Sequence, residues 1–447
     1  MIEKIKTYHR ILRRIVEKSP FLYIWISFLL ALVFLGGFAL AMSFIYSMEI
    51  LEFYTNIPWE MMVSNYVFLV GSSVGLCLLA AMGDVFGLEH FKMIGRRSLF
   101  LSLVFIILGL SSIGLHLGHP ERGAVYNVLT PNFRSAMWWM ATFYPPYIVF
   151  IGLWYWLLSR KSLAKTAAES EGLKARVYGW MALEGLRPYL HRRFAFYRME
   201  TLICRLLPLE QMGLSLDAED AERNWARVAG ALALVFGFLA YTVEGSLFAH
   251  VEARPFWYGA LYPVDFFLGA SLCGLAWFMA MGIITYKVKG HEIPESLKVL
   301  FYEMADILVV LLSLLLLFVA YKMGHGLFEP AKAKTIMLFI KGSFSLAFWL
   351  FEVACGMVLP VGILIYAVRQ KKITGLFLAS VMVLTGYFVK RYDFVVASQV
   401  YPLIKKHQPL ASYFPTAMET LVIGGILGAF LLIYTLGDKF LPLKEDG

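Results

Sequence analysis

About ten long apolar runs divide this chain, and each is long enough to cross a lipid bilayer. A membrane-spanning helix needs roughly 20 apolar residues to cross a hydrocarbon core about 30 Å thick. The chain is 60% hydrophobic and 16% charged, whereas soluble domains carry about 25% charged residues. We therefore predict an all-α polytopic membrane protein. Its spans are expected at 22–46, 62–86, 98–118, 136–158, 228–250, 262–286, 301–321, 339–366, 374–392 and 416–437.

The distribution of Lys and Arg predicts the orientation. Loops between spans tend to lie in the cytoplasm when they are rich in Lys and Arg. An N-terminus on the cytoplasmic side leaves the inside loops richer in these residues than the outside loops, and a basic insert at 159–227 adds to the inside. Ten spans then return the C-terminus to the cytoplasm. The asymmetry is weaker in the second half, where Lys390 and Arg391 fall on the outside.

The net charge of +9 does not indicate nucleic acid, because the basic residues flank apolar runs and orient helices. Within the insert, 186–210 mixes Arg with aromatic and aliphatic residues. Such a segment is typical of an amphipathic helix that lies on anionic membrane lipid or docks a cytoplasmic partner. We expect membrane lipid as a partner and no nucleic acid.

Sequence similarity relates spans two to five with spans six to nine. GSSVGLCLLAAMG (Gly71–Gly83) resembles GASLCGLAWFMAMG (Gly269–Gly282), and LAYTVEG (Leu239–Gly245) resembles TGYFVKR (Thr385–Arg391). Four spans per unit makes the repeats parallel. We predict two repeated four-helix bundles plus two flanking helices. The first flanking helix lies in 1–60, which also holds the N-terminal cytoplasmic segment. The first bundle comprises 61–158 and 228–250, and the insert 159–227 interrupts it. The second bundle comprises 262–392, and flanking helix 10 with the cytoplasmic tail comprises 416–447.

The two predicted bundles differ at aligned polar positions. His116 aligns with Lys322, and Glu244 aligns with Lys390. A change from neutral or acidic to basic indicates that a ligand site kept in the first bundle was lost or altered in the second.

The outer ends of spans two to five bring polar residues together. An ionisable side chain in hydrocarbon costs roughly 2.5–3.5 kcal/mol on insertion scales, so each needs a partner or a function. A quinone needs apolar walls together with hydrogen-bond donors and proton carriers. The proton-handling candidates are His116, His119 and Glu244, and the residues expected to shape the site are Asn65, Tyr66, Arg122, Arg134 and Tyr241. The alternative is that these residues are interfacial anchors and helix caps.

Two further ionisable residues are expected in the eighth span. Lys341 and Glu352 are close to three helical turns apart, which would place them on one face. A proton-conducting column is one interpretation, and an ion pair with a neighbouring helix is the commoner one.

Cysteine and histidine placement argues against bound redox centres. Cys77, Cys204, Cys273 and Cys355 form no CxxC motif, and no histidine lies deep in a span. We expect no haem, no iron–sulfur cluster and no metal on this chain.

The run LHLGHPERGAVYNVLTPNFRSAMWW (Leu115–Trp139) resembles the signature of the NrfD/PsrC family of polysulfide reductase membrane subunits. Val251–Phe267 and Phe388–Pro402 resemble its ten-helix branch, which includes DsrP and the Hme-complex membrane subunit. His116 stands where many members carry Asp, and His119 where Arg is common. This leaves open whether His116 accepts protons or only donates a hydrogen bond.

The resemblance implies a function. Members exchange electrons between menaquinol or menaquinone and a ferredoxin-like iron–sulfur subunit on the outer face, and they carry no redox centre of their own. It further implies cytochrome and other membrane or cytoplasmic subunits, a prokaryotic inner membrane, and sulfur- or sulfite-linked anaerobic respiration. We expect the isolated chain to be inactive.

Two other functions remain open. A secondary transporter or ion-translocating subunit would also have repeats and buried charges, with broken helices around a site at mid-bilayer. A purely structural anchor for partner subunits is the third alternative.

Overall fold

The computed structural model describes residues 20–45, 57–117, 119–183, 218–401, 410–411 and 413–443. Ten helices among these residues are long and apolar enough to cross a membrane, and no strand is present in the described part. The all-α polytopic fold is therefore confirmed. The long helices are α2 (Pro20–Ile45), α3 (Met61–Asp84), α5 (Gly95–His116), α7 (Ala136–Ala168), α11 (Ala218–Ala249), α12 (Tyr262–Val288), α13 (Glu295–Leu327), η3 (Ala347–Val358) continued by α15 (Leu359–Arg369), α16 (Ile373–Ala397) and α17 (Ala417–Phe440).

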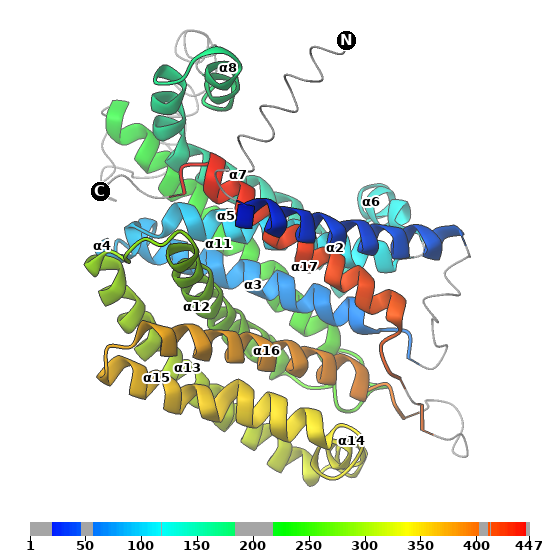
Figure 1. Ribbon diagram of the computed structural model, residues 1–447. Coiled ribbons are helices and arrows are strands. Elements are labelled where there is room, and N and C mark those ends of the chain that lie inside the picture. The colour runs from blue at the N-terminus through cyan, green and yellow to red at the C-terminus, as the bar shows by residue number, and fades with distance from the viewer. Residues whose placement is uncertain are drawn as a thin grey trace, which may run out of the picture.

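Four short helices mark the two ends of the molecule. The long helices run alongside one another between an end with α4 (Glu89–Lys92) and α8 (Gly172–Met181) and an end with α6 (Pro120–Leu129) and α14 (Pro330–Ile340) (Figure 1). We call these the α8 end and the α6 end. Helix α2 begins at the α8 end and α17 finishes there (Figure 1).

The long helices pack in neighbouring groups. Helices α3, α5, α7 and α11 contact one another, as do α12, α13, η3–α15 and α16, while α2 packs on α17. A glycine–tyrosine contact recurs at aligned positions. A Cβ atom at Gly71 would meet the phenol of Tyr241, and one at Gly269 would meet the phenol of Tyr387. The division into repeated bundles, with the boundaries given above, stays a prediction.

Helices α3 and α12 join the two groups at the centre of the molecule. Their backbones meet at Gly75, where an added Cβ would collide with the backbone of Ala270 and Gly274. Small residues let helices approach closely in lipid, where packing replaces the hydrophobic driving force. Helix α3 also contacts α5, α11 and α16, and most of its residues are buried.

The eighth span is not the continuous helix that we predicted over 339–366. Helix α14 ends at Ile340, and the chain turns through the Gly- and Ser-containing stretch 341–344 before the π-helix η3 begins at Ala347. Gly and Ser favour turns over helix interiors. Lys341 is consequently exposed beyond α14, so its predicted shared face with Glu352 was wrong.

Several helices are longer than their apolar runs. Helix α7 continues to Ala168 and α11 starts at Ala218, so both extend into the polar insert, where Arg160 pairs with Glu222. Hydropathy marks the part of a helix that lies in lipid, not the end of the helix. The predicted amphipathic segment 186–210 lies outside the described residues.

Helix α16 also passes its predicted end. It runs to Ala397, so Lys390, Arg391 and Asp393 are buried helical residues. Our assignment of Lys390 and Arg391 to an outer loop was wrong, because buried acidic partners make these cations compatible with the span.

Candidate functional site

Three buried side chains from three helices form a network near the α6 end. The Tyr144 hydroxyl, on α7, donates a hydrogen bond of 2.8 Å to Glu244 Oε2, on α11. The Tyr66 hydroxyl, on α3, lies 2.7 Å from that of Tyr144. Tyr66 and Tyr144 are each 4% exposed and Glu244 is 1% exposed. The network therefore places a carboxyl group and two phenols together inside an apolar bundle.

The second carboxylate oxygen of Glu244 takes no part in these hydrogen bonds. Its Oε1 atom is buried and has no hydrogen-bond partner within the part of the chain that the structure describes. A buried polar atom without a partner is rare and points to a ligand, a water molecule or a catalytic role. An ionised carboxylate can accept a hydrogen bond from a hydroxyl, and a protonated one can donate to a carbonyl. This atom can therefore exchange a proton with a bound molecule.

Tyr241 is held in a structural hydrogen bond. It lies three residues before Glu244, so the two share a face of α11. Its hydroxyl donates to the Val67 carbonyl of α3 at 3.2 Å, in the space that Gly71 leaves open. Tyr241 thus positions α11 against α3 and so shapes the network.

Asn65 and His116 lie on the seam between α3 and α5. Asn65 donates to the Ser112 hydroxyl at 3.2 Å, and Ser112 donates to the Met62 carbonyl at 3.0 Å. His116 lies one turn beyond Ser112, is partly exposed, and has a hydrogen bond to the backbone of Pro58. Because Pro58 has no backbone N–H, the imidazole is the donor. His116 is therefore placed at the last residue of α5, at the α6 end, rather than in the tyrosine network.

The remaining predicted residues lie on the surface at the α6 end. His119 and Arg122 are exposed and face Glu121, with distances of 3.0 Å and 4.0 Å. A backbone hydrogen bond at the start of α6 lowers the pKa of Glu121, and His119 lowers it further. Arg134 is exposed in the loop before α7. The structure brings Tyr66, Tyr241 and Glu244 together and leaves His119, Arg122 and Arg134 outside their network.

Sequence reasoning missed Tyr144. It lies in FYPPY (Phe143–Tyr147), where phenols interrupt an apolar run beside two prolines. A phenol at membrane depth needs a hydrogen-bond partner. That requirement was the available signal, but the partner, Glu244, is 100 residues away in sequence.

A second buried cluster lies between α12 and α16. Asp265 receives hydrogen bonds from Lys390 at 2.6 and 2.9 Å and from Arg391 at 3.1 Å. The Arg391 guanidinium also contacts the Tyr387 hydroxyl and lies 3.9 Å from the centre of the Phe266 ring. The position that aligns with Glu244 is thus a lysine that is already paired.

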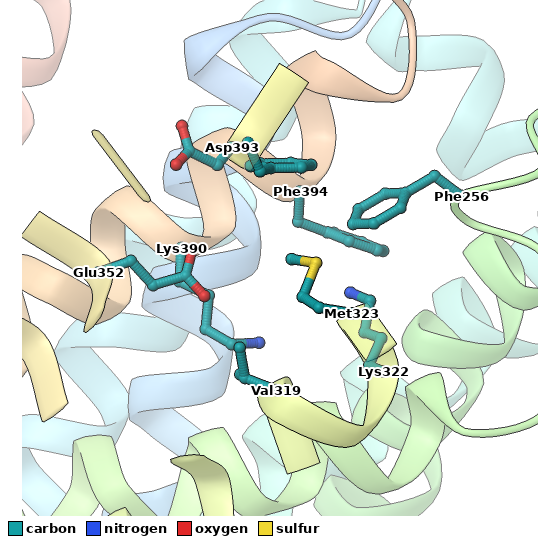
Figure 2. A pocket seen from close by; sticks show the side chains of 9 residues that line it. Phe256, Val319, Lys322, Met323, Glu352, Lys390, Asp393 and Phe394 are labelled. Carbon is teal, nitrogen blue, oxygen red and sulfur yellow. The ribbon is translucent and has the colours of Figure 1, made fainter. Parts of the chain in front are cut away.

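A small pocket adjoins this cluster. The side chains of Lys322, Glu352 and Lys390 come from three helices and lie around one space (Figure 2). Both carboxylate oxygens of Asp393, which also lines it, lack a hydrogen-bond partner among the described residues. The cavity measures about 10 Å³, room for about one water molecule and not for a quinone ring. The second group therefore has buried charges of its own, which include Lys322 and Lys390 at the positions aligned with His116 and Glu244.

Comparison with known proteins identifies the family. Residues 49–402 match the family described as "Polysulphide reductase, NrfD". The chain belongs to the NrfD family. The resemblance drawn from Leu115–Trp139 is confirmed, and ten apolar helices together with membership of the NrfD family make this a multi-pass membrane protein.

Individual relatives match over most of their length. A selenate reductase subunit from Mesobacillus selenatarsenatis is 24% identical over 86% of this chain and 86% of its own. The Hdr-like menaquinol oxidoreductase integral membrane subunit of Archaeoglobus fulgidus is 20% identical over 88% of this chain and 86% of its own. Protein NrfD of Escherichia coli is 23% identical over 78% of this chain and 96% of its own.

Proposed function

We propose that this NrfD-family chain is the quinone-interacting membrane subunit of a respiratory oxidoreductase complex. It exchanges electrons between menaquinol or menaquinone and a partner iron–sulfur subunit. The observation that carries the proposal is Oε1 of Glu244, which has no hydrogen-bond partner among the described residues although it lies inside the Tyr66–Tyr144–Glu244 network. A relative whose name states menaquinol oxidoreduction supports the quinone.

Each residue has a distinct task in this proposal. Oxidation of a quinol releases two electrons and two protons. Glu244 receives a proton through Oε1, while Tyr144 holds Oε2 and Tyr66 holds Tyr144. His116, at the last residue of α5, exchanges protons or donates a hydrogen bond. Asn65 and Tyr241 hold α3 against α5 and α11.

The proposal also includes the orientation of the chain in the membrane and its partner subunits. The α6 end faces outward and binds the ferredoxin-like iron–sulfur subunit through a surface that includes His119, Arg122 and Arg134. The α8 end and both termini face the cytoplasm of a prokaryotic cell. Cytochrome and further membrane or cytoplasmic subunits complete a complex of sulfur- or sulfite-linked anaerobic respiration, and electrons pass through these partners.

The test compares two carboxylates in the complex purified with its co-purifying subunits. Glu244→Gln keeps the side-chain shape and removes the proton acceptor, and we expect menaquinol oxidation to fall at least about 100-fold, as for loss of a general base. Glu252→Gln, at an exposed position, is the matched control and should keep full activity. Unchanged oxidation in Glu244→Gln, with bound quinone retained, would contradict the proposal.

A second candidate function is ion translocation. The interrupted eighth span and the Lys322–Glu352–Lys390–Asp393 pocket favour it, since transporter sites use broken helices and buried charges. Proteoliposomes that contain this chain alone would take up or release an ion if the chain were a secondary transporter. Ion flux that occurs only with quinol and the partner subunits present would instead show that the pocket acts as part of the oxidoreductase complex.

A further inference from the structure

One face of α7 carries hydroxyl groups along most of its length. Tyr144, Tyr147, Tyr155, Ser159 and Ser162 follow one another at intervals close to whole helical turns. They therefore form a row on one face of α7 from the Glu244 network towards the α8 end, interrupted by the buried Ile151 between Tyr147 and Tyr155. Hydroxyl-bearing side chains are expensive in hydrocarbon unless each has a partner, so a row of them needs a reason.

The middle of the row is hydrogen-bonded to two neighbouring helices. The Tyr147 hydroxyl lies 3.0 Å from that of Ser73, on α3, and 3.4 Å from that of Ser102, on α5. Ser73 and Ser102 are themselves 3.0 Å apart, and all three residues are completely buried. A three-hydroxyl junction of this kind could serve helix packing alone.

The hydroxyls nearer the α8 end differ in their hydrogen bonding. The hydroxyls of Ser98, Tyr155 and Ser159 are buried, and none has a hydrogen-bond partner among the described residues. The Tyr155 and Ser159 hydroxyls influence each other, but they do not meet the geometry of a hydrogen bond. Packing does not explain buried hydroxyls that have no hydrogen-bond partner in the described part of the chain. Water is the molecule that usually satisfies such buried groups.

The row connects two defined ends. At the α8 end, Arg96 donates to the Ser162 hydroxyl at 2.9 Å. At the other end, Tyr144 donates to Glu244. The hydroxyls between them, together with Ser98 and Ser102 one turn apart on α5, line one seam between packed helices. We call this the α5–α7 seam.

We propose that the α5–α7 seam carries protons between Glu244 and the α8 end. The inference rests on the proposed function and adds the side of the membrane with which the quinone exchanges its protons. A hydroxyl both donates and accepts, so a row of hydroxyls bridged by water passes protons by successive transfers. For each quinol oxidised, two electrons leave to the iron–sulfur partner and two protons travel along the seam. Quinone reduction reverses both flows.

The consequence is a movement of charge. The Glu244 network lies near the α6 end, whereas its protons enter or leave at the α8 end. Electron transfer to a partner at the α6 end then separates charge across the membrane.

The experiment uses the purified complex in oriented vesicles with a pH-sensitive dye on each side in turn. A soluble menaquinol analogue starts the reaction. In the unsubstituted complex, we expect protons to appear on the side of the α8 end. Tyr147→Phe keeps the ring and removes the central hydroxyl, so it should lower proton appearance there and quinol turnover at least about tenfold.

Two further variants separate proton transfer from packing. Ser159→Ala removes a hydroxyl that pairs with nothing in the described part of the chain, so it should slow proton appearance without loss of thermal stability. Ser111→Ala, on the lipid-exposed face of α5, removes a hydroxyl bonded to the Ile107 carbonyl and should change neither rate.

The outcomes distinguish the two proposals. Release of protons on the α6 side by an active unsubstituted complex would contradict proton transfer along the α5–α7 seam and leave the quinone function standing. Unchanged rates in both Tyr147→Phe and Ser159→Ala would have the same meaning. Failure of the unsubstituted complex to bind or oxidise quinol would overturn both proposals.

Discussion

Two buried acids occupy opposite electrostatic situations in this molecule. Asp265 is saturated by the side chains of Lys390 and Arg391, whereas Glu244 has a phenol on one oxygen and no hydrogen-bond partner among the described residues on the other. A saturated acid stabilises the fold, and an unsaturated one is available for chemistry. The two residues should therefore respond differently to removal of their charge.

Asp265→Asn should destabilise the protein strongly. The substitution leaves Lys390 and Arg391 buried without compensation, which costs about 3–5 kcal/mol for a broken buried pair. Thermal unfolding of the detergent-purified protein measures the effect. Asp306→Asn, at an exposed position on α13, is the control and should unfold like the unsubstituted protein. Equal unfolding temperatures for the two variants would show that the Asp265 pairs contribute nothing.

Close backbone contact holds the elements together where polar contacts are few. The α3–α12 approach at Gly75 joins the two helix groups, and within each group a tyrosine, Tyr241 or Tyr387, lies against a glycine, Gly71 or Gly269. Tolerance to a side chain should differ sharply between glycines in such contacts and glycines that face open space.

Gly75→Ala should separate α3 from α12. Its methyl group would collide with the Ala270 backbone, which cannot move aside as a flexible side chain would. Overpacking of this kind costs about 1–3 kcal/mol. Gly114→Ala, on α5, meets nothing within 4 Å and is the control. Scanning calorimetry in detergent should show a lower unfolding temperature for Gly75→Ala and not for Gly114→Ala. An equal decrease in both variants would show that the α3–α12 contact is not at Gly75.

Element boundaries show what local sequence conveys. Apolar runs located the spans because burial in lipid is a local property of about 20 residues. They could not reveal that α7 continues to Ala168 or that α16 continues to Ala397, because polar residues can remain helical outside lipid or when paired. The interruption before η3 was visible only as a short Gly- and Ser-containing stretch within an otherwise apolar run.

At the scale of the whole molecule, the two ends should face opposite sides of the membrane. Glu252, between α11 and α12, and Glu292, between α12 and α13, are exposed on either side of one span. In intact cells, a membrane-impermeant thiol reagent should label Glu252→Cys and not Glu292→Cys. The unsubstituted protein supplies the background of the native cysteines. The reverse pattern would invert the proposed orientation.

Sequence alone was sufficient for the fold class, the family and the existence of ten spans, because hydropathy and the Leu115–Trp139 motif are contiguous features. Only the tertiary structure decided which polar residues meet. Tyr144 reaches Glu244 across 100 residues, and Lys390 reaches Asp265 across 125. Such pairs depend on how helices rotate and cross, which is set by packing at small residues such as Gly71 and Gly75 rather than by the order of the residues along the chain.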